Sequence, residues 1–361
     1  MKTTLNYTEL NKIPCLTWNW LKMNRASLNT EVDSFLSTAM NIEGNLSDIK
    51  ISQKKEDFDK ALKKFPNTEN KSQKDSISLS EQIGINETLL INVSKKIQEP
   101  LIIHFNLEDK KTYSSAQIIT AEENSQITVI IDYTSLPTAE GFQAIQTKLE
   151  AKAYSKIHLI KVQLLGQNYT QIDNTDSYCA EGASIEITQI QLGGNNVFAA
   201  VHNLLDGYKS NFKSDTAYIC KNKQNLDMTY TVLHKGEQTN TKMIAKGVVS
   251  DSAKKTYRGT IDFRNGCHGA IGDEQEETLL LSPTVINKSI PIILCDEENV
   301  SGTHGATLGK LGADELFYFK SRGISEHQAE KIMSVAKIQS VASLIPNQNI
   351  QEKILDFIQE K

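Results

Sequence analysis

The sequence of 361 residues lacks several features that would assign it to a common functional class. It has no nucleotide-binding loop of the GxxxxGK[ST] type, so we do not expect it to hydrolyse ATP. No apolar run approaches the roughly 20 residues that a membrane span needs, and no apolar segment follows Met1 as in a secretory signal. We therefore expect a cytoplasmic protein without a membrane partner.

The sequence also lacks an excess of basic residues. Its net charge is -5 and the two signs are interspersed, whereas a nucleic-acid binder shows a basic face or stripe. Basic residues cluster only briefly, between Lys152 and Lys161 and at Lys254-Lys255. We expect these short clusters to be solvated strand edges, and we expect no nucleic-acid partner.

Cysteines are few, scattered and odd in number. The five are Cys15, Cys179, Cys220, Cys267 and Cys295, and no two form a CxxC pair. This spacing excludes a disulfide framework and argues against a zinc ribbon or a stable four-cysteine cluster site. In a reducing compartment they are predicted to be free thiols, mostly structural.

Short β-type runs fill the middle of the chain, from about 96 to 305. The run 184–192 alternates strictly between apolar and polar residues, which predicts a strand with one buried face. Similar runs recur every 10 to 20 residues without strong Asn-Gly hairpin signals. This pattern favours a solenoid or a sandwich, and periodicity alone leaves both open.

The two ends have a different pattern. Residues 1–95 are mixed, with helical spacing over 54–65 and a polar loop expected at 67–75. Residues 306–361 return to helical periodicity, with a helix stop at Gly323, a new helix capped by Ser325 and a third helix after Pro346.

Several segments carry a family resemblance, in the right order along nearly the whole chain. The run 300–309, which contains Gly-Thr-His-Gly-Ala-Thr, leads into Leu-Phe-Tyr-Phe-Lys-Ser-Arg-Gly-Ile at 316–324. Upstream lie the strand-like segments 257–263 and 277–282, and Thr-Trp-Asn-Trp-Leu-Lys occupies 17–22. Together they resemble the SufB/SufD family, and the last segment is similar to the N-terminal signature of the SufD branch.

The resemblance implies a mostly β fold: a right-handed parallel β-helix over 96–305, with helical N-terminal (1–95) and C-terminal (306–361) domains. It also implies a non-catalytic scaffold of the SUF system, on which a transient iron–sulfur cluster forms. A SufC-type ATPase would dock on the C-terminal helices. A SufB-type chain, or a second copy of this chain, would join near the end of the β-helix. No residue pattern supports a flavin, whose binding stays open.

His304 is the family-type ligand that the resemblance carries over, as a nitrogen donor to iron or a nascent cluster. By itself, a histidine between Gly302 and Gly305 is typical of a turn that caps the next helix. Many SufD relatives have a cysteine two residues before this histidine, where this chain has Gly302. A partner chain would therefore have to supply the thiolate. The chain also lacks the Glu-His-Glu run of the SufB branch, which favours SufD.

Two cysteines are weaker candidates for the same site. Cys267 and His268 lie in a glycine-flanked turn, where a neighbouring imidazole and arginine would lower the pKa of the thiol and let it accept sulfur. The alternative is a plain surface turn. Cys295 ends an apolar strand close to the expected subunit junction, and its alternative interpretation is a small buried hydrophobe.

Two other functions compete with the scaffold. The chain would be a purely structural partner of a SufB chain if Gly302 leaves the site incomplete. It would be a carbohydrate-active β-helix enzyme if clustered carboxylates lined one face. Acidic residues gather at 273–277, but we expect a turn there, and the strands show no repeated Asp/Glu pattern. We therefore predict that the chain is not an enzyme.

Overall fold

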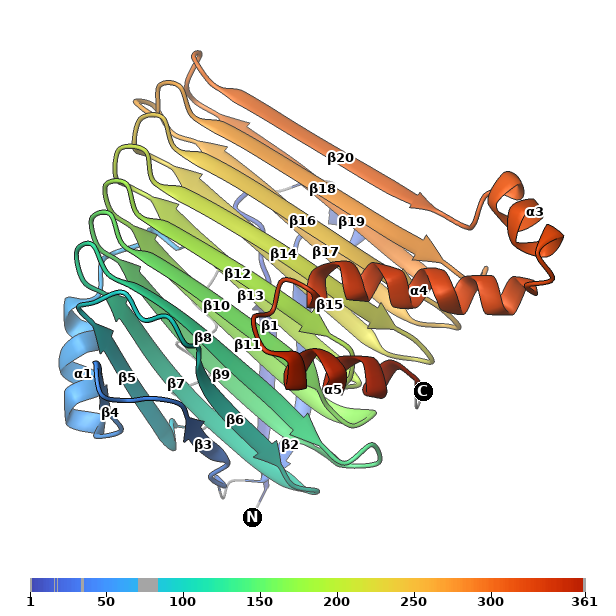
Figure 1. Ribbon diagram of the computed structural model, residues 1–361, viewed down its shortest axis with the longest axis horizontal. Helices are drawn as coiled ribbons and strands as arrows, with labels where there is room; N and C mark the ends of the chain where they lie inside the picture. Colours follow the sequence, from blue (N-terminus) through green and yellow to red (C-terminus); the bar gives the residue numbers. More distant parts are fainter. Residues whose placement is uncertain (1, 16, 18, 34–35, 71–83, 360–361) are drawn as a thin grey trace.

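The chain winds into a parallel β-solenoid whose turns each contribute one strand to each of two facing sheets (Figure 1). The computed structural model describes residues 2–15, 17, 19–33, 36–70 and 84–359. The prediction of a parallel β-helix is therefore confirmed, and the sandwich that periodicity left open is excluded.

Each sheet has nine strands, which run parallel except where β3 meets β6 and β4 meets β5. We name the two sheets after their parallel strands, so the even-numbered sheet also includes the antiparallel strand β3 and the odd-numbered sheet also includes the antiparallel strand β4. The even-numbered sheet contains, in spatial order, β20 (Ser301–Gly309), β18 (Ile271–Leu280), β16 (Asn240–Val249), β14 (Asn211–Cys220), β12 (Ser184–Gln191), β10 (Lys156–Leu164), β8 (Gln126–Ser135), β6 (Leu101–Leu107) and β3 (Met40–Glu43). The odd-numbered sheet contains β19 (Ile286–Cys295), β17 (Lys254–Phe263), β15 (Asn225–His234), β13 (Asn196–Leu205), β11 (Asn168–Cys179), β9 (Glu140–Ala151), β7 (Lys111–Ala121), β5 (Glu87–Val93) and β4 (Ile49–Ser52).

The connections between strands show how the chain passes from one sheet to the other without Asn-Gly hairpins. Along one side of the solenoid, φ lies between 54° and 61° at Asn124, Tyr154, Gly182, Lys209 and Gln238. The backbone amide at each of these positions donates to a carbonyl of the next turn, as from Asn124 to Ala153 at 3.1 Å. One left-handed residue per turn is enough, so the two-residue glycine turns of antiparallel hairpins are not needed.

Inward side chains from both sheets fill the interior of the solenoid. Because parallel partners stay in register, side chains stack in columns, such as Ile127, Ile157, Ile185 and Phe212. Burial of these apolar columns links each turn to the next, as in other repeat folds.

The N-terminal part contains more strand than helix. Strands β1 (Lys2–Leu10) and β2 (Ala26–Asp33) form an antiparallel hairpin, with the short 3-10 helix η1 (Asn19–Leu21) in its connection. The hairpin packs Leu5 and Tyr7 against Phe142 and Ile172 on the outer face of the odd-numbered sheet. This hairpin therefore covers apolar strand surface that would otherwise face water.

Helix α1 (Lys55–Lys64) confirms the helix predicted for 54–65, and its Phe58 packs on Ala116 and Ile118. Residues 67–70 of the expected loop have no regular structure, and 71–75 lie outside the described residues. The first parallel strand, β5, begins at Glu87, which is earlier than the expected boundary at 96.

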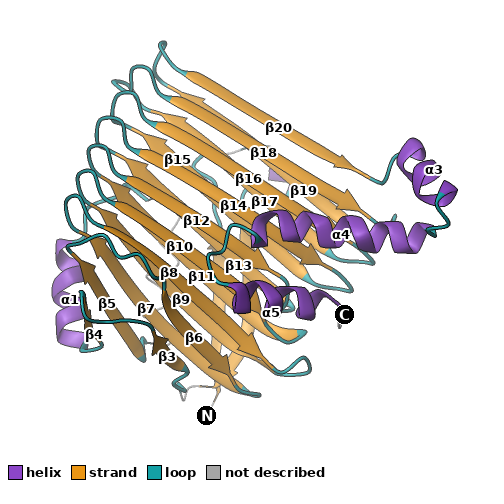
Figure 2. Cartoon of the chain, viewed as in Figure 1, coloured by secondary structure: helices purple, strands orange, loops and turns teal. Residues whose placement is uncertain are grey.

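Three helices follow the solenoid: α3 (Ala313–Ser321), α4 (Glu326–Ala342) and α5 (Gln348–Gln359). The prediction that Ser325 caps the second of them is confirmed, because its hydroxyl accepts from the amide of Gln328 at 3.3 Å. Helices α4 and α5 lie across the even-numbered sheet, where Ile338 and Ile354 join a cluster with Ile160 and Ile190 (Figures 1 and 2).

Candidate functional site

The last strand of the even-numbered sheet, β20, forms an open edge. It pairs with β18 on one side and with no other strand of the described chain on the other. Residues 301–308 are exposed, and the strand from Ser301 to Gly309 carries no Lys, Arg, Asp or Glu. Natural sheets usually protect such edges with charge, proline or a covering segment, so a long uncharged edge is suited to pairing with another chain.

His304 lies in the middle of this edge strand, in extended backbone and not in the turn that its glycine neighbours suggested. Three glycines in this nine-residue strand weaken the strand signal, but pairing with β18 keeps the segment extended. The partner of His304 in the ladder is Glu274 of β18. Side chains alternate along a strand, so His304 shares the inward face with Gly302, whose α-carbon faces Phe263 and Ile293.

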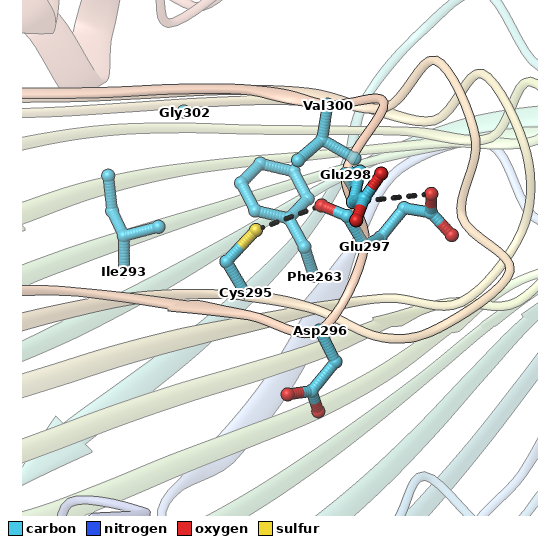
Figure 3. A pocket seen from close by; sticks show the side chains of 8 residues that line it. All are labelled: Phe263, Ile293, Cys295, Asp296, Glu297, Glu298, Val300 and Gly302. Atoms are coloured by element: carbon cyan, nitrogen blue, oxygen red, sulfur yellow. Dashed lines mark hydrogen bonds between the residues drawn. The ribbon is translucent and has the colours of Figure 1, made fainter.

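Cys295 and Gly302 lie at the mouth of the solenoid. Both residues line a shallow hollow of about 650 Å³, together with Phe263, Ile293 and Val300 (Figure 3). The interpretation of Cys295 as a small buried hydrophobe is wrong: the residue is exposed, and its Sγ lies 3.1 Å from the backbone oxygen of Glu297. It is exposed because it belongs to the last turn, with no further turn stacked on it.

Cys267 occupies the expected glycine-flanked turn, but it is buried. Burial, and secondarily the charge of Glu297, raises the pKa of its thiol to about 11. The lowered pKa that would suit a sulfur acceptor is therefore contradicted. Nδ1 of His268, which the sequence placed beside the thiol, lies 3.0 Å from a carboxylate oxygen of Glu297.

Charged residues also lie inside the solenoid, which the sequence did not indicate. Lys161 and Lys255 are fully buried and bond to Asp173 and Glu276 from the facing sheet. The expectation that these lysines lie at solvated edges is wrong, because both point between the sheets. The sequence did contain a signal for this burial. Each lysine lies an even number of residues from inward-facing apolar residues of its strand, so its side chain points to the same, inward side.

The acidic residues at 273–277 lie in strand β18 and not in the expected turn. Asp273 and Glu277 face outward, while Glu274 and Glu276 are buried. Burial, followed by the charges of Glu276 and Asp273, raises the pKa of Glu274 to about 8. Two of the carboxyl groups of this strand therefore lie in the interior and not on an exposed face.

Residues that would bind a metal ion are sparse at this end of the solenoid. Across residues 2–359, leaving out the undescribed positions, no three His, Cys, Asp or Glu side chains group as a metal site. His304 has an accessible imidazole that suits borderline metals such as iron, so it fits a ligand role but cannot complete a site alone.

Among the three C-terminal helices, α3 has no buried residue although it carries Leu-Phe-Tyr-Phe. Phe317 is 75% exposed and Tyr318 is 53% exposed. An apolar helix without a cover is typical of an interaction surface. Helices α4 and α5, in contrast, use their apolar residues to cover the solenoid.

Comparison with known proteins connects this geometry to one family. The family described as "SUF system FeS cluster assembly, SufBD core domain" matches residues 104–337. The chain belongs to the SufB/SufD family. The matched region spans β6 to α4, which includes the open edge and His304. The resemblance seen in the sequence is thereby confirmed.

Curated relatives do not separate the two branches of the SufB/SufD family. The chain is 23% identical to SufD and 22% identical to SufB of Bacillus subtilis, over 68% and 70% of its length. It is 26% identical over 68% of its length to the SufBD family protein ycf24 of Trieres chinensis. These alignments cover 56%, 54% and 53% of the relatives, so the chain spans about half the length of the curated relatives it matches.

None of the described helices is long and apolar enough to cross a membrane.

Proposed function

We propose that this chain is a SufD-like scaffold subunit for iron–sulfur cluster assembly in the cytoplasm, without catalytic activity of its own. The observation that carries the proposal is the open β20 edge with His304 exposed on it. An exposed ligand on an unpaired edge lets a second chain complete both a sheet and a site. The absence of a Glu-His-Glu run supports the SufD branch, whereas Gly302 departs from the cysteine that many SufD relatives have at this position.

A SufB-type chain is the proposed partner at this end, and a second copy of the present chain is the alternative. Strands β19 and β20 both end their sheets at the same end of the solenoid. A partner with its own exposed strands would extend both sheets through main-chain hydrogen bonds. It would also cover Cys295 and the hollow beside Gly302.

A SufC-type ATPase is the proposed partner of the C-terminal helices. The exposed aromatic residues of α3 make this helix the better candidate, rather than the whole region after Leu311. Removing residues 325–361 would uncover the apolar outer face around Ile160 and Ile190. Substitutions confined to α3 are therefore the sharper test of ATPase docking.

The nascent cluster is cargo of the complex in this proposal. His304 would supply a nitrogen ligand, and thiolates would come from the partner chain or from Cys295. A site assembled from two chains with few ligands holds its cluster weakly, which suits a scaffold that must release its product. No observation favours a flavin, and we do not propose one.

The second candidate is a structural partner that supports a SufB-type chain without binding iron. The thiol missing at Gly302 favours it. The deciding experiment is anaerobic cluster reconstitution of the complete complex with His304→Ala. Thr303→Ala is the matched control, because Thr303 faces the other side of β20 and bonds to Asp273 at 2.8 Å.

We expect His304→Ala to lower the cluster yield while the subunits still assemble, and Thr303→Ala to retain the yield. An unchanged yield with His304→Ala, in a complex of normal composition, would instead support the purely structural role. Assembly is measured by size-exclusion chromatography and the cluster by its visible absorption.

A further inference from the structure

The interior of the last two turns holds more negative than positive charge. Glu274 and Glu276 are each 2% exposed, and Lys255 is fully buried beside them. Lys255 Nζ and the hydroxyl of Ser289 bond to Glu276. Glu274 has no such partner: its Oε2 is buried and makes no hydrogen bond with any described residue.

This arrangement leaves one buried carboxyl group without a hydrogen-bond partner or a salt bridge among the described residues. An ionised carboxylate away from water is strongly disfavoured unless it is paired or binds a metal. The one lysine in the cluster already pairs with Glu276. The hydroxyl of Tyr257 is also buried and without a hydrogen-bond partner among the described residues. A bound cation would provide the partner that Glu274 lacks.

The backbone around Glu274 makes room for its carboxylate. Gly259 lies opposite on β17, and a Cβ there would come within 2.6 Å of both carboxylate oxygens of Glu274. Any larger residue at 259 would push the carboxylate away. The Glu274 side chain therefore occupies space that depends on this glycine, and it extends across the interior toward the facing sheet.

The mouth of the solenoid brings a second ligand close. His304 is the direct ladder partner of Glu274, one turn nearer the open end. Paired residues of neighbouring strands begin about 5 Å apart and point to the same side, so both side chains enter the interior at the mouth of the solenoid. Carboxylate and imidazole together suit divalent iron and its analogue manganese.

We propose that Glu274 and His304 form a two-ligand site for a divalent cation of the iron type at the mouth of the solenoid. Two protein ligands leave the remaining positions to water, a partner chain or sulfide. The site would hold ferrous iron before a cluster forms. This inference deepens the proposed function, because it rests on His304 facing iron there.

The test measures binding of Mn²⁺, and of Fe²⁺ under anaerobic conditions, to the full chain. Electron paramagnetic resonance of free Mn²⁺ gives the affinity, and the shift in melting temperature gives an independent readout. The variants are Glu274→Gln, His304→Ala and the matched control Glu277→Gln, whose side chain lies on the outer face of the same strand. Circular dichroism checks that each variant is folded.

We expect one site per chain, a loss of affinity of roughly tenfold or more with Glu274→Gln and with His304→Ala, and no change with Glu277→Gln. Normal binding by folded Glu274→Gln, together with a loss in His304→Ala, would overturn the role of Glu274 and leave the proposed function standing. Normal binding by both variants, or no binding by the wild-type chain, would overturn the site altogether. If Glu274→Gln fails to fold, Gly259→Ala provides the second test, and retained affinity there would count against the proposal.

Discussion

Lys353 on the last helix forms an ion pair of 2.5 Å with Asp132, a fully buried residue of β8 that lies 221 positions earlier. The same carboxylate oxygen contacts Nδ1 of His104 at 3.1 Å. The other oxygen of Asp132 is buried without a partner in the described chain. This pair fixes α5 on the even-numbered sheet and holds the end of the chain against its middle.

Replacing Lys353 with Met should weaken the attachment of α5. The substitution keeps the apolar stem but leaves the buried Asp132 with one partner fewer, so we expect a loss of about 1–2 kcal/mol in unfolding free energy. Chemical denaturation measures this change. Lys320→Met is the control, because Lys320 pairs with Glu326 on an exposed surface and should change stability by less than about 0.5 kcal/mol. Equal effects of the two variants would contradict the role of Lys353.

Asp176 should make the unfolding free energy of the chain fall at low pH. Burial opposes its charge, but the hydrogen bond from His202 and the charge of Lys148 outweigh burial and lower the pKa of Asp176 to about 2. Thr68 donates a further hydrogen bond of 2.7 Å. Because the folded-state pKa lies below the unfolded value, the stabilisation is complete above about pH 4 and is lost as the pH falls toward 2.

Asp176→Asn tests this contribution through the slope of stability against pH. Between pH 5 and pH 2 the wild-type chain should lose about 2 kcal/mol more than Asp176→Asn. The slope is compared, and not the absolute stability, because the variant also disturbs His202 and Lys148. Parallel slopes for the two chains would show that Asp176 does not titrate in this range.

The fold was predictable where the residue pattern is local. Strict alternation over 184–192 predicts a strand, and Ser325 with Gln328 predicts a helix start, because each signal needs only neighbouring residues. The family motif around His304 could also be recognised, because it is a contiguous run of residues. Local signals could not decide between a solenoid and a sandwich, since both use half-buried strands of similar length.

The interior charges were not predictable, because their partners are set by which strands face each other across the solenoid. Lys255 meets Glu276 from the other sheet, and a charged residue in a strand more often faces water. The pairing of His304 with Glu274 depends on the length of the last turn. His304 itself lies in a strand because β18 offers it a ladder, which no neighbouring residue reveals.

Gly302→Cys should strengthen cluster binding. The new thiol would lie on the inward face of β20, two residues before His304, in the hollow that Cys295 also lines. A Cβ at this position would lie 2.9 Å from the Phe263 ring, so the ring must shift, and we expect a stability cost of about 1 kcal/mol. Slower loss of the cluster from the reconstituted complex is the expected result.

Gly305→Cys is the matched control for the added thiol. Gly305 lies on the same strand, but its side-chain direction is open and no atom lies within 4 Å of a Cβ there. We expect this variant to retain the cluster no better than the unmodified chain. If both cysteines slow cluster loss equally, the gain comes from any nearby thiol and not from the geometry at 302.

Docking of the ATPase should depend on α3 alone among the C-terminal helices. Phe317 and Tyr318 are exposed, and truncating a central aromatic residue at an interface typically costs about 2 kcal/mol or more. Phe317→Ser combined with Tyr318→Ser should therefore weaken binding of a SufC-type ATPase at least about 30-fold, measured by calorimetry. Because α3 covers no part of the solenoid, the melting temperature should stay unchanged. Leu136→Ser, at an exposed turn of the solenoid, is the control and should bind normally. Undiminished binding by the double variant would place the docking surface on another face of the chain.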